Sequence, residues 1–331
     1  MEKVVVTGGG GFVGSVIVRQ LLEKGCKVIV AARRRYHELE KLGAISRTGD
    51  IGDSSFVNDL CRDVDVVFHT AAKAGIWGKW EEYERTNVTG TRNILAACKE
   101  LGIRRLVYTS TPSVVFSGSD IKNGDETLAY SSRFLCHYAK SKVMAEQLVL
   151  KANSSSLTTC AIRPHLVWGP RDPHLIPRLI ERGKSGSLKR VGAGDNLVDI
   201  TYVDNVAHAH ILAAEAMGKG SKIGGQAYFI GQERPVNLWE WINDLFLDLG
   251  IDPVKSHVSF RTACFIGIIL EGSYRLLGRS AEPRMTRFLA EQLARSHYFS
   301  HAKAKEDFGY KPIISLAEGQ KRLLTWLREK K

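Results

Sequence analysis

The sequence predicts an α/β fold in which a doubly wound parallel sheet is joined to a smaller, mostly helical C-terminal lobe. Short β-branched runs alternate with helical patterns from the N-terminus onward, and these runs are nearly continuous in Val and Ile, as is typical of strands buried on both faces. Beyond residue 166 the alternation gives way to glycine-rich, basic loops and separate helices. We expect residues 1–165 to form the sheet domain, which also takes segments from about 195–230, and residues 166–331 to form mainly the lobe.

The predicted elements follow each other in a regular order. Strands are predicted at KVVVT, KVIVAA, VDVVFHT, RRLVYTS and TTCAIRP. Hydrophobic periodicity predicts helices at 12–24, 36–42, 83–101, 134–152, 203–217, 238–249 and 284–295. The sheet should therefore have six or more strands, and the lobe should cover their carboxyl ends, where open α/β sheets bind ligands.

Composition excludes several functional classes. The net charge of +12, from 47 basic and 35 acidic residues, favours acidic small molecules ahead of a membrane surface, and nucleic acid is not expected. The cysteines lack a C-x-x-C pair and the histidines lack ligand spacing, so we predict neither disulfides nor a metal. No apolar stretch approaches the roughly 20 residues of a membrane span, and no leader peptide is recognised. We therefore expect a cytoplasmic protein.

The segment TGGGGFVG, Thr7–Gly14, lies between the first predicted strand and the first predicted helix. Its glycines fit G-x-G-x-x-G, which lets backbone N–H groups at a helix N-terminus approach a pyrophosphate that side chains would obstruct. The pattern predicts a Rossmann-type dinucleotide site with contacts from Gly8, Gly9, Gly11, Phe12, Val13 and Gly14.

The end of the second predicted strand indicates which dinucleotide binds. NAD sites usually place an acidic residue here for the ribose 2′-hydroxyl. In this chain Arg33, Arg34 and Arg35 come first, and no acid appears before Glu38. A guanidinium can pair with a 2′-phosphate, so we predict that NADP(H) is preferred over NAD(H), with Arg33 as the contact.

The segment YAKSK places Tyr138 and Lys142 on one face of a predicted helix, because four residues are just over one turn. Hydride transfer to a carbonyl needs a proton donor for the alkoxide that forms, and a phenol can serve. An unperturbed tyrosine has a pKa near ~10, which a neighbouring ammonium would lower. The pair therefore predicts a proton-transfer site.

Together these motifs resemble the extended short-chain dehydrogenase/reductase family. Besides Thr7–Gly14, the resemblance rests on GDI at 49–51, HTAA at 69–72, TNVTGT at 86–91, YTSTPSVV at 108–115 and YAKSK at 138–142. It implies cofactor contacts from Asp50, Ile51, Ala71, Ala72, Tyr138, Lys142, Pro164 and Val167. It also implies a homodimer built from the helices near 81–101 and 134–152.

The same resemblance assigns roles around the phenol. Thr111 would be the hydroxyl that orients the substrate carbonyl, with Ser110 as a helper. Asn87 would support the proton relay, and Lys142 would also bind the nicotinamide ribose.

Further segments are closer to the 3β-hydroxysteroid dehydrogenase branch than to sugar-nucleotide epimerases. KAGIWG, RPHLVWGP, TRFLAEQL and DFGYKP resemble the 2-alkyl-3-oxoalkanoate reductases of bacterial long-chain olefin biosynthesis. That resemblance implies NADPH-dependent reduction of the ketone of a bulky, apolar β-keto acid. Candidate substrate contacts are Trp77 and a set of basic residues that could meet a carboxylate, namely Lys73, Arg163, His165 and Arg171.

Three other functions stay open. The chain could oxidise a 3β-hydroxysteroid or a sterol-4α-carboxylate, it could epimerise or dehydrate a sugar nucleotide, or it could sense a dinucleotide without catalysis. Residues 261–279 could rest on a membrane, form the mouth of a lipid-sized pocket, or be an ordinary buried helix. Association with other biosynthetic enzymes or with a membrane surface would suit a lipid-like or sterol-like acidic substrate.

Overall fold

The computed structural model describes residues 1–218 and 220–329. At its centre is a parallel seven-stranded sheet with the order β12-β7-β5-β4-β1-β2-β3. The strands are β1 (Lys3–Thr7), β2 (Lys27–Ala32), β3 (Ile45–Thr48), β4 (Val66–His69), β5 (Arg105–Thr109), β7 (Thr158–Pro164) and β12 (Gln226–Ile230). The predicted doubly wound fold is confirmed.

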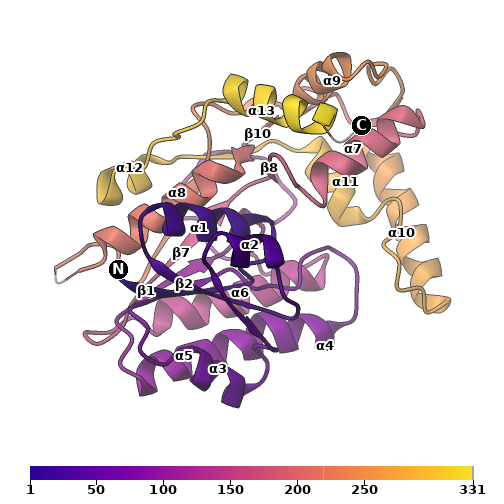
Figure 1. Ribbon diagram of the computed structural model, residues 1–331. Coiled ribbons are helices and arrows are strands. Elements are labelled where there is room, and N and C mark those ends of the chain that lie inside the picture. Colours follow the sequence, from indigo (N-terminus) through magenta and orange to yellow (C-terminus); the bar gives the residue numbers. More distant parts are fainter. Residues whose placement is uncertain (219, 330–331) are drawn as a thin grey trace.

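Helices cover both faces of this sheet (Figure 1). One face carries α1 (Phe12–Glu23), α2 (His37–Lys41) and α8 (Val203–Ala216), and the other carries α3 (Ser54–Leu60), α5 (Gly90–Glu100) and α6 (His137–Lys151). Side chains alternate between the two layers, because Val4 and Val6 join one core and Val5 the other. Both layers are apolar, which explains why the strands read as unbroken hydrophobic runs.

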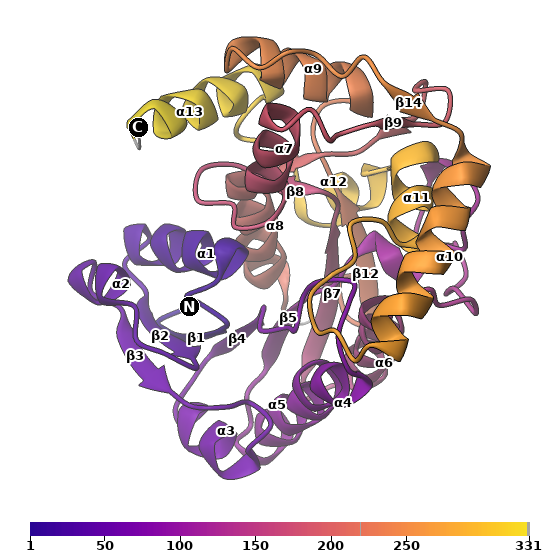
Figure 2. The same cartoon turned by 90° about the vertical axis from the view of Figure 1, so that its right-hand side faces the viewer.

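The second half of the chain forms a lobe with its own core, which includes Trp168, Ile200, Trp241 and Phe246. Its helices are α7 (Leu175–Lys184), α9 (Leu238–Asp248), α10 (Phe260–Leu276), α11 (Arg287–Ala294) and α13 (Leu316–Glu329). Helix α12 (Ala302–Phe308) instead packs on the sheet domain through Ala304 and Phe308. Figure 2 shows α7, α10 and α11 beyond the carboxyl ends of the central strands. The lobe is therefore placed to cover a ligand bound at those ends.

Short strands tie the lobe to the sheet domain. A four-stranded sheet joins β13 (Val236–Asn237), β10 (Leu197–Val198), β15 (His297–Phe299) and β6 (Ile121–Gly124) in that order. Two further pairs are β11 (Thr201–Tyr202) with β8 (Val167–Trp168) and β14 (His257–Val258) with β9 (Arg190–Val191). Because β6 comes from the N-terminal half, the lobe is not made of C-terminal residues alone.

The helix predicted at 83–101 is not one regular helix. It consists of α4 (Trp80–Tyr83), a π-helical turn at Glu84–Thr89, and α5. A π-turn inserts an extra residue without disturbing the hydrophobic period enough to be read from sequence, and such turns are frequent at functional sites. Next to it Gly90 packs against Ile51, where a Cβ would collide with the isoleucine side chain.

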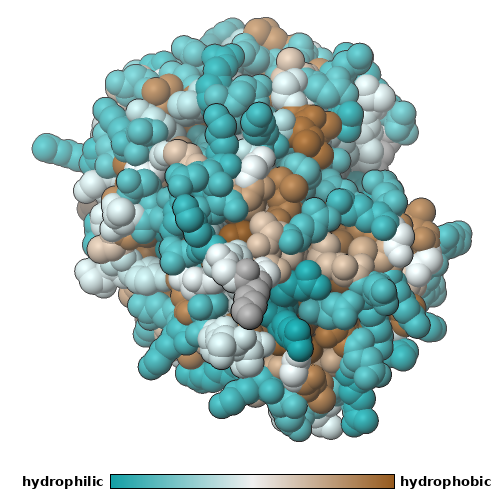
Figure 3. Space-filling view, turned by 90° about the vertical axis from the view of Figure 1, so that its left-hand side faces the viewer, coloured by the Kyte–Doolittle hydropathy of each residue, from teal (hydrophilic) through white to brown (hydrophobic). Residues whose placement is uncertain are grey.

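Helix α10 lies along the outer edge of the lobe (Figure 2). Only Ala263, Gly267 and Glu271 are buried, a narrow stripe with a spacing of four residues. Six large apolar side chains are exposed on the helix and its C-cap: Phe265, Ile266, Ile268, Ile269, Leu276 and Leu277. Of the three alternatives left open for residues 261–279, the ordinary buried helix is therefore wrong. Figure 3 shows the opposite side of the molecule, where hydrophilic residues predominate.

None of the helices within residues 1–218 and 220–329 is long and apolar enough to cross a bilayer.

Candidate active site

The glycine segment forms a backbone cradle at the start of α1. Gly11 is the N-cap of this helix and supplies no side-chain cap, so N–H groups of the first turn are free to bind an anion. A Cβ at Gly14 would collide with the carbonyl oxygen of Gly8, and one at Gly9 would lie 2.9 Å from the carbonyl oxygen of Val6. The glycines are required for this close approach, and the cradle fits a dinucleotide pyrophosphate.

A cavity of about 560 Å³ runs from this cradle to the middle of the sheet edge. We call it the catalytic cavity. It brings together the cradle and the predicted proton-transfer groups, and its lining includes Gly8, Gly11, Phe12, Val13, Gly14, Ala72, Ser110, Thr111, Tyr138, Lys142, Pro164, His165 and Val167. Residues from β5, α6 and the end of β7 therefore meet at the place where the strand order reverses between β1 and β4.

Tyr138 lies in the first turn of α6, and its half-buried phenol lines the catalytic cavity together with the Thr111 hydroxyl. Burial raises the pKa of Tyr138 to about 12, against a smaller lowering from the Thr111 hydrogen bond. The expectation that the Lys142 ammonium lowers this pKa is not met in the structure. The phenol is therefore protonated at neutral pH, which is the form that can donate a proton to an alkoxide.

Lys142 lies one turn further along α6 and is buried. Its Nζ donates a hydrogen bond to the carbonyl oxygen of Thr109 at 2.5 Å and lies 4.2 Å from the centre of the Tyr108 ring. Burial lowers the pKa of Lys142 to about 7, although the charge of Glu146 opposes this shift. Its charge state can therefore change near neutral pH.

Two serines accompany Thr111 in the catalytic cavity. The buried Oγ of Ser110 has no hydrogen-bond partner within residues 1–218 and 220–329. An orphaned buried hydroxyl is costly, so this atom is suited to bind a ligand. Ser113, which the sequence motifs do not single out, places its Oγ 3.1 Å from the Thr111 hydroxyl and also lines the cavity. It follows Thr111 in a turn, and only the tertiary structure brings it to the cavity.

Asn87 lies in the π-helical turn and is buried. Its side chain accepts a hydrogen bond from the Lys73 backbone N–H at 2.7 Å, and its amide donates to the Lys73 carbonyl and to the Ser141 hydroxyl. These hydrogen bonds of the Asn87 amide hold the segment after β4 against α6. In this geometry Asn87 positions the wall of the site and does not contact Lys142.

A buried chain of hydrogen bonds links the cradle to the π-helical turn. The Thr91 hydroxyl donates to the Asn87 carbonyl at 2.6 Å, so it accepts from Nε2 of His69 at 3.0 Å. Nδ1 of His69 then accepts from the Thr7 hydroxyl at 2.7 Å. Burial, with a contribution from the charge of Lys142, lowers the pKa of His69 to about 3, so the ring is neutral. This histidine is a structural connector.

The remaining predicted cofactor residues lie around the cradle in different ways. The backbone of Ala71 lies close to Gly8. Asp50 is paired with Arg85, with 2.9 Å between Nη2 and Oδ2, and Ile51 is buried beneath Gly90. Asp50 and Ile51 do not line the catalytic cavity.

Arg33 is exposed at the end of β2 and has no hydrogen-bond or ion-pair partner among the described residues. The neighbouring Arg34 lies over the ring of Tyr36, with 5.1 Å from its guanidinium carbon to the ring centre, and Arg35 pairs with Glu40. Arg33 is therefore the cation of this run that remains available to a ligand.

The cations expected to meet the substrate are mostly paired elsewhere. Arg171 forms an ion pair with Glu38, and Lys73 forms one with Glu82. Arg163 pairs with the buried Glu146 beneath the sheet edge. None of these three cations lines the catalytic cavity. Their acidic partners lie in other elements of the fold, so sequence patterns do not reveal these ion pairs.

His165 does line the catalytic cavity, but as a neutral ring. Nε2 of His297 lies 2.9 Å from the Gln292 carbonyl and must donate to it, so Nδ1 of His297 accepts from Nε2 of His165 at 2.6 Å. Burial, with a smaller effect of His297, holds the pKa of His165 well below its usual range. The remaining nitrogen of His165 is therefore an acceptor, which does not suit a carboxylate.

Trp77 and Lys73 line a second cavity of about 830 Å³, which we call the lobe cavity. It lies beside the catalytic cavity, because Ile76 lines both. The C-terminal end of α10 contributes Tyr274 and Arg275, and Trp77 donates from Nε1 to the carbonyl oxygen of Arg279 at 3.1 Å. Residues 73–79 thus separate two spaces, one on the cofactor side and one beneath α10.

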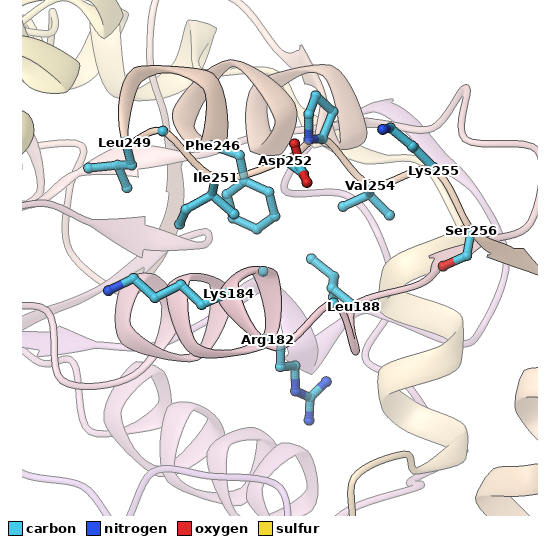
Figure 4. A pocket seen from close by; sticks show the side chains of 14 residues that line it. Arg182, Lys184, Leu188, Phe246, Leu249, Ile251, Asp252, Val254, Lys255 and Ser256 are labelled. Carbon is cyan, nitrogen blue, oxygen red and sulfur yellow. The ribbon is translucent and has the colours of Figure 1, made fainter.

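A third cavity, of about 700 Å³, lies between α7 and α9 (Figure 4). Figure 4 shows Arg182 and Lys184 on the α7 side and Phe246 on the α9 side. It shares no lining residue with the catalytic cavity. No group of three or more His, Cys, Asp or Glu side chains within the described ranges could hold a metal ion.

Comparison with known proteins identifies the family. Residues 5–261 match the 3-beta hydroxysteroid dehydrogenase/isomerase family. The chain is 48% identical over 326 residues to the 2-alkyl-3-oxoalkanoate reductase of Shewanella oneidensis, which covers 96% of this chain and 84% of that protein. It is 34% identical over 326 residues to the decarboxylating sterol-4-alpha-carboxylate 3-dehydrogenase of Mus musculus, covering 97% of this chain and 90% of that one.

A solved structure, MoeE5 in complex with UDP-glucose and NAD, is similar with a TM-score of 0.75 and 26% identity, and the match covers 99% of both chains. The resemblance that the motifs predict is thus confirmed at the level of the family. The chain belongs to the 3-beta hydroxysteroid dehydrogenase/isomerase family, a branch of the extended short-chain dehydrogenases/reductases, and is an oxidoreductase that acts on CH–OH or C=O groups.

Proposed function

We propose that this chain reduces the ketone of a 2-alkyl-3-oxoalkanoate to the 2-alkyl-3-hydroxyalkanoate, with NADPH as the hydride donor, as a step of long-chain olefin biosynthesis. The name of the Shewanella oneidensis relative supports the substrate class. The observation that carries the reaction type is the half-buried, protonated phenol of Tyr138, which lines the same cavity as the Thr111 hydroxyl and the glycine cradle.

The proposed chemistry divides among a few side chains. A nicotinamide cofactor bound at the glycine cradle would supply the hydride for the carbonyl carbon. Thr111 and the unpartnered hydroxyl of Ser110 hold the carbonyl oxygen, and Tyr138 gives it a proton as the alkoxide forms. Lys142, whose ammonium points to the Thr109 carbonyl, would hold the ribose of the nicotinamide, as the resemblance implies.

A preference for NADPH over NADH is part of this proposal. The NAD in the MoeE5 complex supports a nicotinamide dinucleotide in general. The exposed Arg33 at the end of β2, which has no hydrogen-bond or ion-pair partner among the described residues, supports the phosphorylated form, because a guanidinium binds a phosphate.

A second candidate substrate is a sterol-4α-carboxylate. The name of the Mus musculus relative supports it. A carboxyl at C4 beside an oxygen function at C3 makes that sterol a β-oxygenated acid, as the 3-oxoalkanoate is. The two candidates therefore share the reacting unit and differ in the shape of the apolar part.

The test is steady-state turnover of NADPH and NADH by the purified protein with three substrate classes. These are 2-alkyl-3-oxoalkanoates of several chain lengths, 3-oxo sterols carrying a 4-carboxylate, and sugar nucleotides. We expect the highest kcat/KM with the alkyl acids and NADPH. Turnover confined to sterols would support the second candidate, and turnover confined to sugar nucleotides would contradict both.

We also propose that the protein works in the cytoplasm as a homodimer and associates peripherally with an anionic membrane through α10. Exposed apolar side chains and exposed cations share this helix and its C-terminal extension, where Arg261, Arg275 and Arg279 are exposed. The single acid of α10, Glu271, is buried and paired with Arg287. An apolar face bordered by cations is suited to an anionic lipid surface.

A further inference from the structure

The catalytic cavity contains a cation that no motif predicts. Two lysine or arginine side chains occur among the described residues that line it, Lys142 and Arg178. Lys142 is engaged with the Thr109 carbonyl and the Tyr108 ring. Arg178, on α7, is therefore the cation of this cavity that can meet a negatively charged group on a substrate.

Arg178 already holds a carboxylate. Its Nη1 lies 2.9 Å from Oε1 of Glu282 and its Nη2 lies 3.1 Å from Oε2, which is the parallel two-bond geometry of an arginine–carboxylate pair. Glu282 is the acidic side chain among the described lining residues of the cavity. It comes from the segment that joins α10 to α11, so the pair connects two sides of the lobe.

We propose that Arg178 is the receptor for the carboxylate of the substrate, and that Glu282 occupies this position until the substrate displaces it. The inference rests on the proposed function, because it requires a β-keto or β-hydroxy acid. A carboxylate in an acid-binding cavity would otherwise repel the substrate, and its pairing with Arg178 removes that repulsion while the cavity is free of ligand.

The exchange is energetically easy. Side-chain exposure is 52% for Arg178 and 19% for Glu282, and ion pairs that remain in contact with water contribute little to stability. The ion pair of Arg178 with Glu282 would be replaced by an equivalent two-bond pair of Arg178 with the substrate carboxylate. Glu282 can then turn to solvent, because residues 277–281 just before it are exposed.

Displacement of Glu282 by the substrate would also affect the strip of residues that separates the two cavities. Trp77 donates a hydrogen bond to the Arg279 carbonyl, three residues before Glu282, and so ties this segment to the strip that separates the two cavities. Release of Glu282 would therefore loosen the segment on the side of the catalytic cavity, where alkyl chains must pass.

The experiment compares an acid with a matched neutral substrate. A 2-alkyl-3-hydroxy acid is oxidised with NADP⁺, since it does not lose carbon dioxide as the keto acid does, and the secondary alcohol of the same carbon skeleton without the carboxyl is the partner. We expect Arg178→Gln to raise KM for the acid by about tenfold or more while KM for the alcohol changes little, because a charge-assisted pair is lost. Glu282→Gln should lower KM for the acid.

Arg182→Gln is the matched control, because Arg182 lies one turn further along α7 and lines the separate cavity of Figure 4. It should leave both substrates unaffected. If the pair were only a structural latch, Arg178→Gln and Glu282→Gln would shift KM in the same direction and equally for acid and alcohol, which would overturn the inference. Turnover of neither substrate by the unmodified protein would overturn the proposed function together with it.

Discussion

At the scale of single residues, burial sets the protonation states of the two groups that define the candidate site. The phenol of Tyr138 is protonated over the whole ordinary pH range, because burial raises its pKa to about 12. This favours reduction, in which the phenol donates. Oxidation would need the phenolate as a base, so we expect the oxidation rate to rise toward alkaline pH.

Lys142 should control the pH dependence of reduction. Burial lowers its pKa to about 7, so the Lys142 side chain is a charged ammonium below this pH and a neutral amine above it. We expect kcat/KM for ketone reduction to fall as pH rises through about 7, with no contribution from Tyr138. The profile should be recorded from about pH 5.5 to about pH 9.

Lys142→Arg is the control for this profile, because an arginine stays charged throughout. Its rate can be lower, but the fall near neutral pH should disappear. A fall of the same shape in this variant would assign the titration to another group.

Arg33 should determine the cofactor preference. We expect Arg33→Ala to lower the ratio of kcat/KM for NADPH to that for NADH by about tenfold, because a charge-assisted contact with the 2′-phosphate is lost. Arg35→Ala should leave the ratio unchanged, since Arg35 is already paired with Glu40. An unchanged ratio in the Arg33 variant would remove this residue from the cofactor site.

At the scale of elements, the loop between β1 and α1 depends on the absence of a side chain at one position. A Cβ at Gly14 would collide with the Gly8 carbonyl, and the three nearest atoms all belong to the backbone. We expect Gly14→Ala to weaken NADPH binding by about tenfold or more and to lower the thermal midpoint, because the cradle must open.

Fluorescence titration with NADPH and thermal unfolding measure the two effects. Gly272→Ala is the comparison, since a Cβ there meets nothing within 4 Å. Unaltered cofactor affinity in the Gly14 variant would show that the cradle does not bind the pyrophosphate.

The doubly wound parallel sheet could be predicted from single elements, whereas the ion-pair partners of charged residues could not. Val4, Val5 and Val6 are buried alternately on both faces, so the strand is recognisable from three adjacent letters. Lys73 and Arg171 were expected at the substrate, but their ion-pair partners Glu82 and Glu38 lie in other elements. Pairing of this kind depends on distances that only the folded chain defines.

The same limit applies to the pKa of Tyr138. The spacing of Tyr138 and Lys142 correctly predicts that both face the catalytic cavity. It does not predict that the Lys142 ammonium donates a hydrogen bond to the Thr109 carbonyl. Nor does it predict that burial has the largest effect on the pKa of the phenol. Arg178 and Glu282 were missed because neither belongs to a recognised motif. Only the packing of the lobe on the sheet domain brings them to the catalytic cavity.

At the scale of the whole molecule, the lobe presents its apolar helix to solvent. We expect the protein to sediment with vesicles containing phosphatidylglycerol and not with vesicles of phosphatidylcholine alone, because cations border the apolar face of α10. Ile269→Asp should abolish this binding.

Ile313→Asp is a matched control, since Ile269 and Ile313 are equally exposed at 52%. Equal vesicle binding by the two variants would contradict a membrane role for α10. Conversion of a dimer to a monomer by Ile269→Asp alone, seen by size-exclusion chromatography, would instead identify α10 as a subunit interface.

The proposal that Tyr138 protonates the reduced ketone is tested most directly by the steady-state rate of NADPH oxidation with a 2-alkyl-3-oxoalkanoate in the unmodified protein and in Tyr138→Phe. We expect kcat to fall by about a hundredfold or more, since a positioned general acid contributes a factor of this size, while NADPH affinity is retained. Turnover that stays within about twofold of the unmodified protein would contradict the assignment of the phenol as the proton donor.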